Sequence, residues 1–295
     1  MRIGTWNIIS ARTRVDRVIE CCARWNLDVL AMQEIKCKPD QFPIDAFTDA
    51  GYRVEVHGLN QWNGVAIASR LPILSVSRDF PGAPTWGDPA RVEARALRVR
   101  IDDGTPEGLD VWSLYVPNGR EIDHPHYQYK LQWLAALRAA VSPYVAGDSS
   151  GVSKGDAPGE DSLAEGGAVP PATASDEGGS PSALLVGDWN VAPRDEDVWD
   201  IDFFDGRTHF TQPERSAFES FAADGWVEAT RPRVTNYTYW DYQQLRFPRN
   251  EGMRIDFMYA TPALDARITQ AWIDRDERKG KGASDHVAVI VEVAH

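Results

Sequence analysis

The apolar positions of the chain form short continuous runs and, less often, runs at helical spacing. Continuous runs rich in Val, Ile, Leu and Tyr predict strands, and apolar residues three and four positions apart predict helices. Strands are predicted at residues 1–9, 28–33, 51–56, 64–69, 92–101, 109–116, 183–189, 255–259 and 286–293. Helices are predicted around Val15, Val18, Ile19 and Cys22, at 126–141 and near 214–223. Strands outnumber helices and often follow one another directly, so the pattern predicts an α/β protein with mixed or antiparallel sheets.

One segment, residues 146–182, lacks such runs and is rich in Gly, Ala, Ser and Pro. It holds seven acidic residues against one basic residue, Lys154. This composition buries too little apolar surface to fold alone, so the segment is either a linker between domains or an insertion in one domain. Because candidate site residues occur on both sides of it, we expect one domain over residues 1–295 with a disordered acidic insertion at about 146–182.

The composition is that of a globular protein, with 43% hydrophobic and 25% charged residues among 295. The N-terminal residues lack the basic start and cleavage site of a secretory signal, and no apolar run is long enough to span a bilayer. Cys21, Cys22 and Cys37 have the spacing of neither a disulfide framework nor a zinc site. We therefore expect a cytoplasmic protein with reduced thiols and no membrane partner.

The net charge of −13 is unusual for a protein that binds nucleic acid, which commonly presents a basic surface. The acidic segment alone carries −6 of it, however, and the other residues together carry −7. Because the local field at a site matters more than the total charge, the composition does not exclude a polyanionic substrate.

Polar side chains stand at or just beyond the ends of several predicted strands. In LLVGDWNVAP, Asp188 and Asn190 share one face of an extended chain, while Trp189 points into the packing. Further polar residues of this kind are Asn7, Glu34, Tyr115, Asp256, Asp285 and His286. Each alone is explained as a turn former, a helix cap or a structural residue. Together they would be costly to bury without partners, and their oxygen atoms suit Mg²⁺ or Mn²⁺, so the set predicts phosphoester chemistry.

Seven short motifs occur along the chain in the order TWN, QEIK, NGVAI, YVPNG, GDWNVAP, RIDFMY and SDH. In sequence and order they resemble the exonuclease III family of DNA-repair nucleases, AP endonucleases within the wider endonuclease/exonuclease/phosphatase superfamily. The resemblance runs from Met1 to about Val293 and is interrupted only by the acidic segment. It implies a four-layer α/β sandwich of the DNase I-like type, in which two packed mixed sheets are flanked by helices.

The resemblance implies a divalent-metal site at Glu34, with Asn7 beside it and Asp285 contributing. The metal would be Mg²⁺, which Mn²⁺ can replace. Lys36 would lie near the metal and the DNA phosphate, although a solvated surface lysine is the alternative. The chain departs from the family at Ile9, where a polar Asn or Asp is usual. This departure would weaken a second metal position while leaving the Glu34 site intact.

Five residues acquire catalytic roles through the same resemblance. Asp188 would orient or deprotonate the attacking water. Asn190, His286 and Tyr115 would contact the scissile phosphate. Asp256 would fix the orientation of His286 through a hydrogen bond.

The resemblance also implies contacts with DNA. Residues that would grip the DNA backbone are Arg12, Asn118 and Arg120, together with Arg278, Lys279 and Lys281 in the run RDERKGKGASDH. An ordinary solvated loop explains that run equally well. Tyr239 and Trp240 in NYTYWDY would line an apolar pocket for an abasic sugar with Met253 and Ile255. Core packing is the alternative for the two aromatic residues, and we expect one of them to point inward.

The expected protein is a monomeric, Mg²⁺-dependent enzyme that cuts duplex DNA 5′ to abasic sites. Exonuclease activity from 3′ ends and removal of 3′-phosphates are expected beside it. Two alternatives stay open: a phosphoesterase of the same fold acting on RNA or a small phosphorylated metabolite, and a non-catalytic DNA-binding module. Tyr115 argues against the first, because DNase I-like nucleases and phosphoinositide phosphatases tend to carry a second catalytic histidine there. The nearly complete motif set argues against the second.

Overall fold

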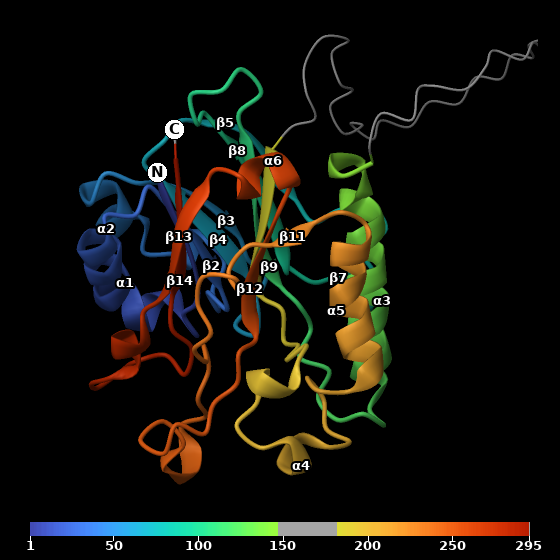
Figure 1. Cartoon of the computed structure of the whole chain (residues 1–295). Coiled ribbons are helices and arrows are strands. Elements are labelled where there is room, and N and C mark those ends of the chain that lie inside the picture. The colour runs from blue at the N-terminus through green and yellow to red at the C-terminus, as the bar shows by residue number, and fades with distance from the viewer. Residues whose placement is uncertain (147–181, 295) are drawn as a thin grey trace, which may run out of the picture.

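The computed structural model describes residues 1–146 and 182–294. Two six-stranded sheets pack face to face, and helices cover the outer face of each, which gives four layers (Figure 1). The α/β sandwich of two mixed sheets expected from the sequence is therefore confirmed. None of the helices in residues 1–146 and 182–294 is long and apolar enough to cross a membrane.

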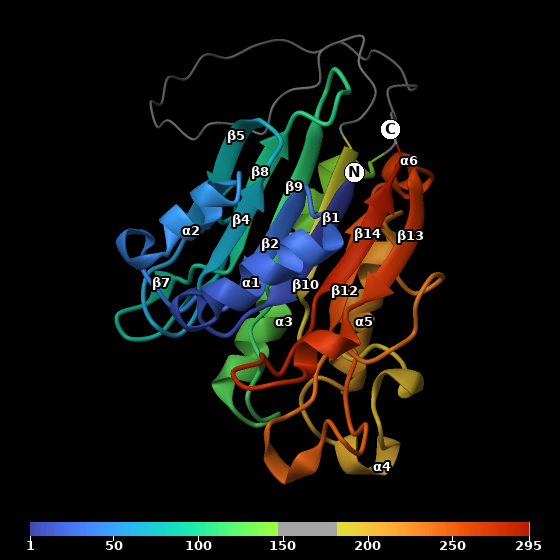
Figure 2. The ribbon, with the colours of Figure 1, turned by 90° about the vertical axis from the view of Figure 1, so that its left-hand side faces the viewer.

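The first sheet has the strand order β13-β14-β1-β2-β4-β3. Its strands are β1 (Arg2–Asn7), β2 (Val29–Gln33), β3 (Arg53–His57), β4 (Val65–Ser69), β13 (Ile268–Ile273) and β14 (Val289–Val293). β1 and β2 run parallel, and all other neighbours run antiparallel. The helices α1 (Ala11–Trp25) and α2 (Ile44–Asp49) lie on its outer face, in front of the strands in Figure 2.

The second sheet has the order β11-β12-β10-β9-β8-β5. Its strands are β5 (Ile73–Arg78), β8 (Ala96–Ile101), β9 (Leu109–Tyr115), β10 (Ser182–Asp188), β11 (Val227–Glu228) and β12 (Asp256–Ala260). Only β9 and β10 run parallel. The helices α3 (Pro125–Val141) and α5 (Gln212–Ala223) cover it. Shorter elements are the hairpin of β6 (Thr85–Trp86) and β7 (Arg91–Val92), α4 (Ile201–Phe204) and α6 (Pro262–Asp265).

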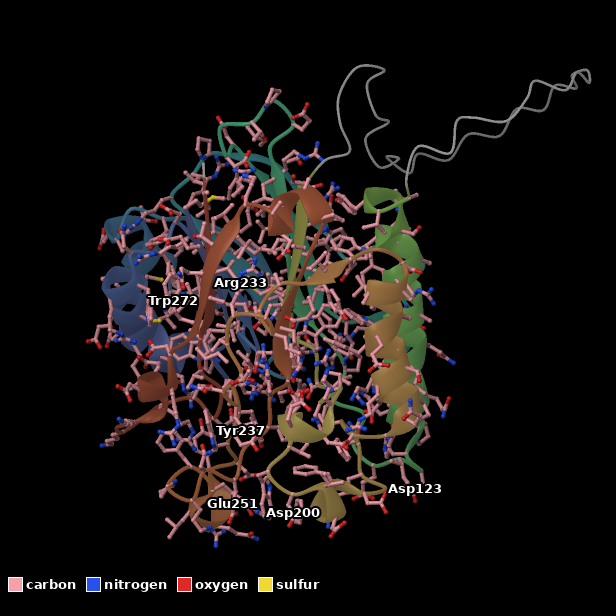
Figure 3. All side chains as sticks on the ribbon, viewed as in Figure 1. Asp123, Asp200, Arg233, Tyr237, Glu251 and Trp272 are labelled. Atoms are coloured by element: carbon pink, nitrogen blue, oxygen red, sulfur yellow. The ribbon has the colours of Figure 1, made fainter. Side chains whose placement is uncertain are left out.

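Apolar side chains fill the three spaces between the four layers (Figure 3). Along β10, Val186 faces the other sheet and Leu185 faces the helices, because successive residues of a strand point to opposite faces. Along β1, Ile3 and Trp6 divide in the same way. Burial on both faces explains why the central strands appear in the sequence as continuous apolar runs.

The predicted elements differ from the structure in several details, and the short elements α2, α4, α6, β6 and β11 were not predicted. The predicted strand 92–101 is broken, because β7 ends at Val92 and β8 begins at Ala96. The last predicted strand, 286–293, begins only at Val289. The strands β5 and β13 were not predicted; both lie at sheet edges and are partly exposed, so their residues show neither a continuous apolar run nor a clean alternation.

The predicted acidic insertion at about 146–182 lies almost wholly outside the described residues. β9 precedes it and β10 follows it, and the two strands pair in parallel from Leu109–Ser182 to Tyr115–Asp188. The same apolar clusters draw residues from both sides of the segment. The pairing of these two strands agrees with one domain over residues 1–295, which remains a prediction.

We expect Trp189→Ala to lower the free energy of unfolding by about 3–5 kcal/mol. The indole is fully buried and packs edge to face against Phe218, Phe221 and Tyr259. Urea denaturation followed by circular dichroism measures the loss. The matched control is Trp62→Ala, since Trp62 is 71% exposed and its removal should change stability by less than about 0.5 kcal/mol. Equal losses in the two variants would contradict this account of the core.

Candidate active site

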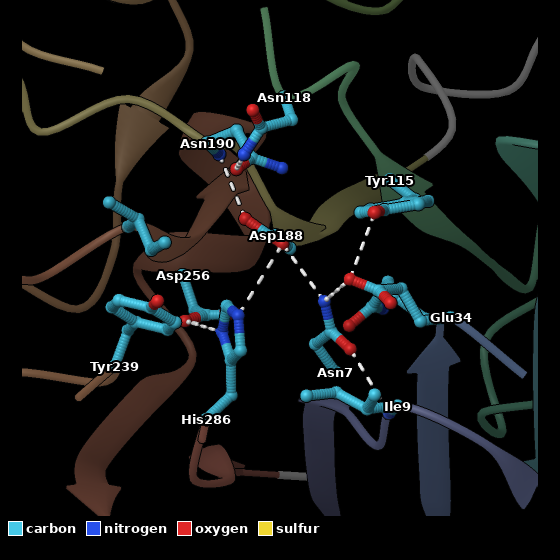
Figure 4. Close-up of polar contacts among 12 residues, drawn as sticks. Asn7, Ile9, Glu34, Tyr115, Asn118, Asp188, Asn190, Tyr239, Asp256 and His286 are labelled. Carbon is cyan, nitrogen blue, oxygen red and sulfur yellow. Dashed lines mark hydrogen bonds and ion pairs between the residues drawn. The ribbon is translucent and has the colours of Figure 1, made fainter. Parts of the chain in front are cut away.

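The parallel strand pairs β1–β2 and β9–β10 deliver their carboxyl ends to one edge of the two sheets, the lower end in Figure 1. Asn7 ends β1, Tyr115 ends β9 and Asp188 ends β10, while Glu34 directly follows β2. The four side chains point toward one another (Figure 4). Two strand pairs from different sheets thus build a single polar cluster.

The antiparallel neighbours add the remaining acids and the histidine. Asp256 begins β12 and lies directly opposite Asp188 in the strand register. Asp285 and His286 precede β14, and the Trp6 indole donates a hydrogen bond to the His286 carbonyl oxygen at 3.0 Å. The structure therefore brings every predicted metal-binding and catalytic residue to this edge.

A carboxamide connects the acids of the two sheets. Asn7 Nδ2 donates to Glu34 Oε1 and to Asp188 Oδ2, at 3.0 Å in each case. Asn7 Oδ1 accepts the backbone N–H of Ile9 at 3.2 Å. Asn7 therefore lies beside Glu34 and links the two carboxylates. Its carbonyl oxygen keeps a second lone pair, so Asn7 as part of the metal site stays a prediction.

Glu34 is kept ionised by its neighbours. Burial alone would raise its pKa, but Lys36 Nζ, 2.7 Å from Oε2, and the hydrogen bonds from Asn7 and Tyr115 together lower the pKa. Tyr115 Oη donates to Glu34 Oε1 at 2.8 Å, and the Arg95 guanidinium lies 4.7 Å from the centre of the Tyr115 ring. Lys36 thus pairs with the Glu34 carboxylate, while its side chain stays 30% exposed.

His286 lies between two carboxylates. Its Nδ1 is 2.9 Å from Asp256 Oδ2, and its Nε2 is 3.7 Å from Asp188 Oδ2. Burial opposes a charged imidazole, but the two carboxylates outweigh it and raise the pKa of His286 to about 10. Burial raises the pKa of Asp188 to about 7; His286 opposes this shift and Asp256 adds to it. Near neutral pH the histidine is a cation, and Asp188 can take up or release a proton.

Asp285 indicates where a cation fits. Its Oδ1 is buried and has no hydrogen-bond partner among the described residues. Burial and the Glu34 charge raise the pKa of Asp285, against the influence of His286. A hard divalent cation such as Mg²⁺ or Mn²⁺ satisfies such an oxygen, so Glu34 and Asp285 fit the expected metal. Asp188, Asp256 and His286 also have donor atoms within 4.8 Å of one another, and Asp256 Oδ1 likewise is buried without a hydrogen-bond partner among the described residues.

The sequence analysis missed a second histidine at this edge. His209 precedes α5, with Nε2 2.9 Å from Asn190 Oδ1 and 3.1 Å from Asn118 Nδ2. Burial lowers the pKa of His209 to about 3, so the ring is neutral at pH 7. The local sequence offers one signal, the capping box of Thr211 and Glu214 that starts α5. That signal predicts a helix start and does not reveal what lies beside Asn190.

Several residues of the site have left-handed backbone conformations. The φ angles are 45° at Ile9, 50° at Glu34, 53° at Lys36 and 51° at Asn190. Asn tolerates this region, whereas a β-branched residue such as Ile9 rarely adopts it. Such conformations cost on the order of 1–3 kcal/mol each and persist where the surroundings hold them. One such restraint is the hydrogen bond from the Ser10 N–H to the Glu34 carbonyl oxygen at 2.7 Å.

The aromatic residues of NYTYWDY divide between the site and the core. Tyr239 lies against His286 with ring centres 4.9 Å apart, and it packs with Met253 and Ile255 in one apolar cluster. Trp240 is fully buried. The prediction that one of the pair points inward is therefore confirmed, and Trp240 as a DNA contact is wrong. Ile255 is 2% exposed and packs within this cluster.

The basic residues predicted to contact DNA differ in solvent exposure and in the partners that they already have. Arg12, Arg120 and Lys281 are exposed. Lys279 Nζ lies 2.5 Å from an exposed carboxylate oxygen of Asp276, and it remains 60% exposed. Arg278 is half-buried and donates Nη2 to the Trp240 carbonyl oxygen at 3.1 Å, which leaves other guanidinium donors free, so its phosphate contact stays a prediction.

Known proteins match the chain over nearly its whole length. The model of the Endonuclease/Exonuclease/phosphatase family matches residues 4–286. An exodeoxyribonuclease III from Haemophilus influenzae is 23% identical and aligns over 99% of each chain. The structure of an AP endonuclease from Archaeoglobus fulgidus is 30% identical over 99% of each chain, with a TM-score of 0.79. A 3′ phosphatase from Neisseria, solved with a product DNA hairpin, is 27% identical over 100% of each chain, with a TM-score of 0.82.

We expect metal-free Asp188→Asn to gain stability relative to the wild type as pH rises. The Asp188 pKa is about 7 in the folded protein against 3.8 for the ordinary side chain. Between these values the folded state keeps a proton that the unfolded state has lost, so the free energy of unfolding of the wild type falls as pH rises. The asparagine variant lacks this loss, so its free energy of unfolding relative to the wild type should rise between pH 4 and pH 8.

Urea denaturation at pH 4, 6 and 8 in EDTA measures this difference. The matched control is Asp123→Asn, which removes an exposed carboxylate on the loop before α3 (Figure 3). A gain that does not depend on pH, or one shared by the control, would refute the raised pKa of Asp188.

Proposed function

The chain belongs to the endonuclease/exonuclease/phosphatase family, and from this premise we propose that it is a DNA-repair nuclease of the exonuclease III type. The proposed reaction is metal-dependent hydrolysis of the phosphodiester 5′ to an abasic site, together with removal of nucleotides and phosphates from 3′ ends. The exodeoxyribonuclease III, AP endonuclease and 3′ phosphatase among its relatives support both parts.

The arrangement around Asp188 carries the proposal. Its Oδ1 accepts the backbone N–H of Asn190 at 2.9 Å and its Oδ2 accepts from Asn7, so both oxygens have fixed directions. With a pKa of about 7, this carboxylate can accept a proton from a water molecule near neutral pH. A buried base with this pKa, beside a protonated histidine, suits hydrolysis of a phosphoester.

The neighbours of Asp188 would bind the phosphate. The His286 cation and the Asn190 carboxamide stabilise negative charge that develops on the phosphoryl oxygens. Asp256 holds the His286 ring through Nδ1. A divalent cation at Glu34 and Asp285, Mg²⁺ or Mn²⁺, would add Lewis-acid stabilisation of the same charge.

The surroundings of the site suit duplex DNA. Tyr239 lies against His286 and is backed by the apolar cluster that contains Met253, an arrangement that suits a deoxyribose that has lost its base. Arg12 and Lys281 are exposed cations for the backbone phosphates. One chain supplies all of these groups, so we propose a monomer. The free, buried cysteines agree with a reducing cytoplasm.

We expect Glu34→Gln to weaken metal binding at least about tenfold and cleavage at least about a hundredfold, because a neutral carboxamide is a poor ligand for a hard cation. Mn²⁺ binding to the free protein, followed by electron paramagnetic resonance, gives a readout that does not need DNA. The matched control is Glu20→Gln, which removes an exposed carboxylate from α1. Unchanged Mn²⁺ affinity in Glu34→Gln would remove Glu34 from the metal site.

Substrates for the wild type are duplexes with an abasic analogue, a 3′-phosphate or a recessed 3′ end, each with Mg²⁺ or with EDTA. The proposal requires Mg²⁺-dependent cleavage of at least the abasic duplex. Hydrolysis confined to RNA or to a small phosphate ester would favour the phosphoesterase alternative.

We expect duplex affinity to fall steeply with salt, with a log–log slope of roughly −0.9 for each phosphate contact. Lys281→Glu should flatten the slope and weaken binding to abasic and intact duplex alike, because phosphate contacts carry no information about the lesion. Tyr239→Ala should instead reduce the preference for the abasic duplex and leave the slope unchanged. The control Arg53→Glu makes the same charge change at the start of β3, far from the site. Fluorescence anisotropy at several salt concentrations measures the affinities and the slopes. A slope in Lys281→Glu equal to that of the wild type would contradict the assigned phosphate contact.

A further inference from the structure

Three loops carry the groups on the phosphate side of the site, and one buried ion pair joins them. We propose that Lys130 of α3 and Glu214 of α5 are positioning residues that hold these loops in their catalytic geometry. The inference deepens the proposed nuclease function and rests on it. Neither side chain would touch the substrate, since both are completely buried.

Lys130 reaches two of the loops directly. Its Nζ donates to the carbonyl oxygen of Asn190 at 2.6 Å and to that of Asn118 at 3.3 Å. The third donor goes to Glu214 Oε1. An ammonium group has three N–H donors, so all of them are used.

Glu214 secures the third loop. Its Oε1 accepts from Thr208 Oγ1 and from the His209 N–H, both at 2.9 Å. Its Oε2 accepts from Thr211 Oγ1 at 2.7 Å. The ion pair thus anchors the loop that carries His209 to the same point as Asn118 and Asn190.

The anchoring acts on the residue that directs the proposed base. Asn190 has a left-handed backbone with φ 51°. Its N–H donates to Asp188 Oδ1, and its carbonyl oxygen accepts from Lys130. The backbone of Asn190 is therefore held on both sides, and its side chain meets Asn118 and His209. Loss of the Lys130 contact would release this conformation and misdirect both Asn190 and Asp188.

A stabilising role alone is a weak explanation for this pair. Desolvation largely offsets the attraction within a buried ion pair, so such pairs contribute little net stability. Their better-attested contribution is to fix one geometry among several. Lys130 and Glu214 lie directly behind the phosphate-side loops, where an ion pair can fix the geometry of these loops.

The test compares Lys130→Met with Arg100→Met, a control on β8 opposite Asp110, which lies at the end of β9 away from the site. Arg100 donates twice at 2.8 Å to the fully buried Asp110, so the control also breaks a pair with a buried acid. Both variants are assayed for kcat and KM on the abasic and the 3′-phosphorylated duplexes. Side-chain amide signals of Asn118 and Asn190 are recorded by ¹H–¹⁵N NMR on metal-free protein. If Lys130→Met does not fold, Glu214→Gln takes its place.

We expect Lys130→Met to lower kcat at least about tenfold, since a misplacement of 1 Å can cost about a hundredfold. KM should stay within about threefold, because distant backbone contacts set duplex affinity. The Asn118 and Asn190 signals should shift or broaden in this variant alone. Glu214→Gln should show the same changes to a smaller extent.

A folded Lys130→Met, or its substitute Glu214→Gln, with wild-type kcat or unchanged Asn118 and Asn190 signals would overturn the proposal. An equal loss of kcat in Arg100→Met would overturn it as well. A wild type that does not cleave the abasic duplex would refute the proposed function instead, and the NMR comparison would still decide whether the pair positions these loops.

Discussion

Four carboxylates lie at one buried edge of the protein, and their mutual repulsion is the constraint that the surrounding structure has to meet. Glu34 comes from one sheet and Asp188 from the other, so the site exists only while the sheets stay in register. Asn7 bridges these two acids through one nitrogen. His286 offsets Asp188 and Asp256, and Lys36 offsets Glu34. The charge that remains at Asp285 is what a divalent cation would balance.

A polar layer just beneath the site maintains that register. Gln33 Nε2 donates to Thr5 Oγ1 in its own sheet and to Ser113 Oγ in the other, at 3.0 Å in both cases. Thr5 precedes Asn7 by two positions and Ser113 precedes Tyr115 by two, so each lies on the same strand face as the site residue beyond it. Sliding one sheet over the other would break these buried hydrogen bonds, each of which is expensive to leave unmade. Metal side and phosphate side are thus held at a fixed separation.

The sequence predicted those parts of the site that follow strand periodicity. Asp188 and Trp189 were assigned to opposite faces correctly, because alternation in a strand is strict. His209 and Lys130 could not be found in this way, since a loop and a helix bring them to Asn190 and only the packing of α3 and α5 decides that contact. Trp240 was misassigned because Tyr239 and Trp240 are both aromatic, and local pattern alone does not tell which ring faces the core.

The left-handed residues at the site have a consequence for how freely the rest of the chain can vary. The free energy of unfolding of an ordinary domain is only about 5–15 kcal/mol. Ile9, Glu34 and Lys36, at roughly 1–3 kcal/mol each, take a substantial share of what the two sheets and their helices provide. The core can therefore tolerate fewer destabilising substitutions. A protein that keeps Ile9 and Glu34 in these conformations has less stability left to lose elsewhere. Selection for the geometry of one edge therefore limits the evolution of residues far from it.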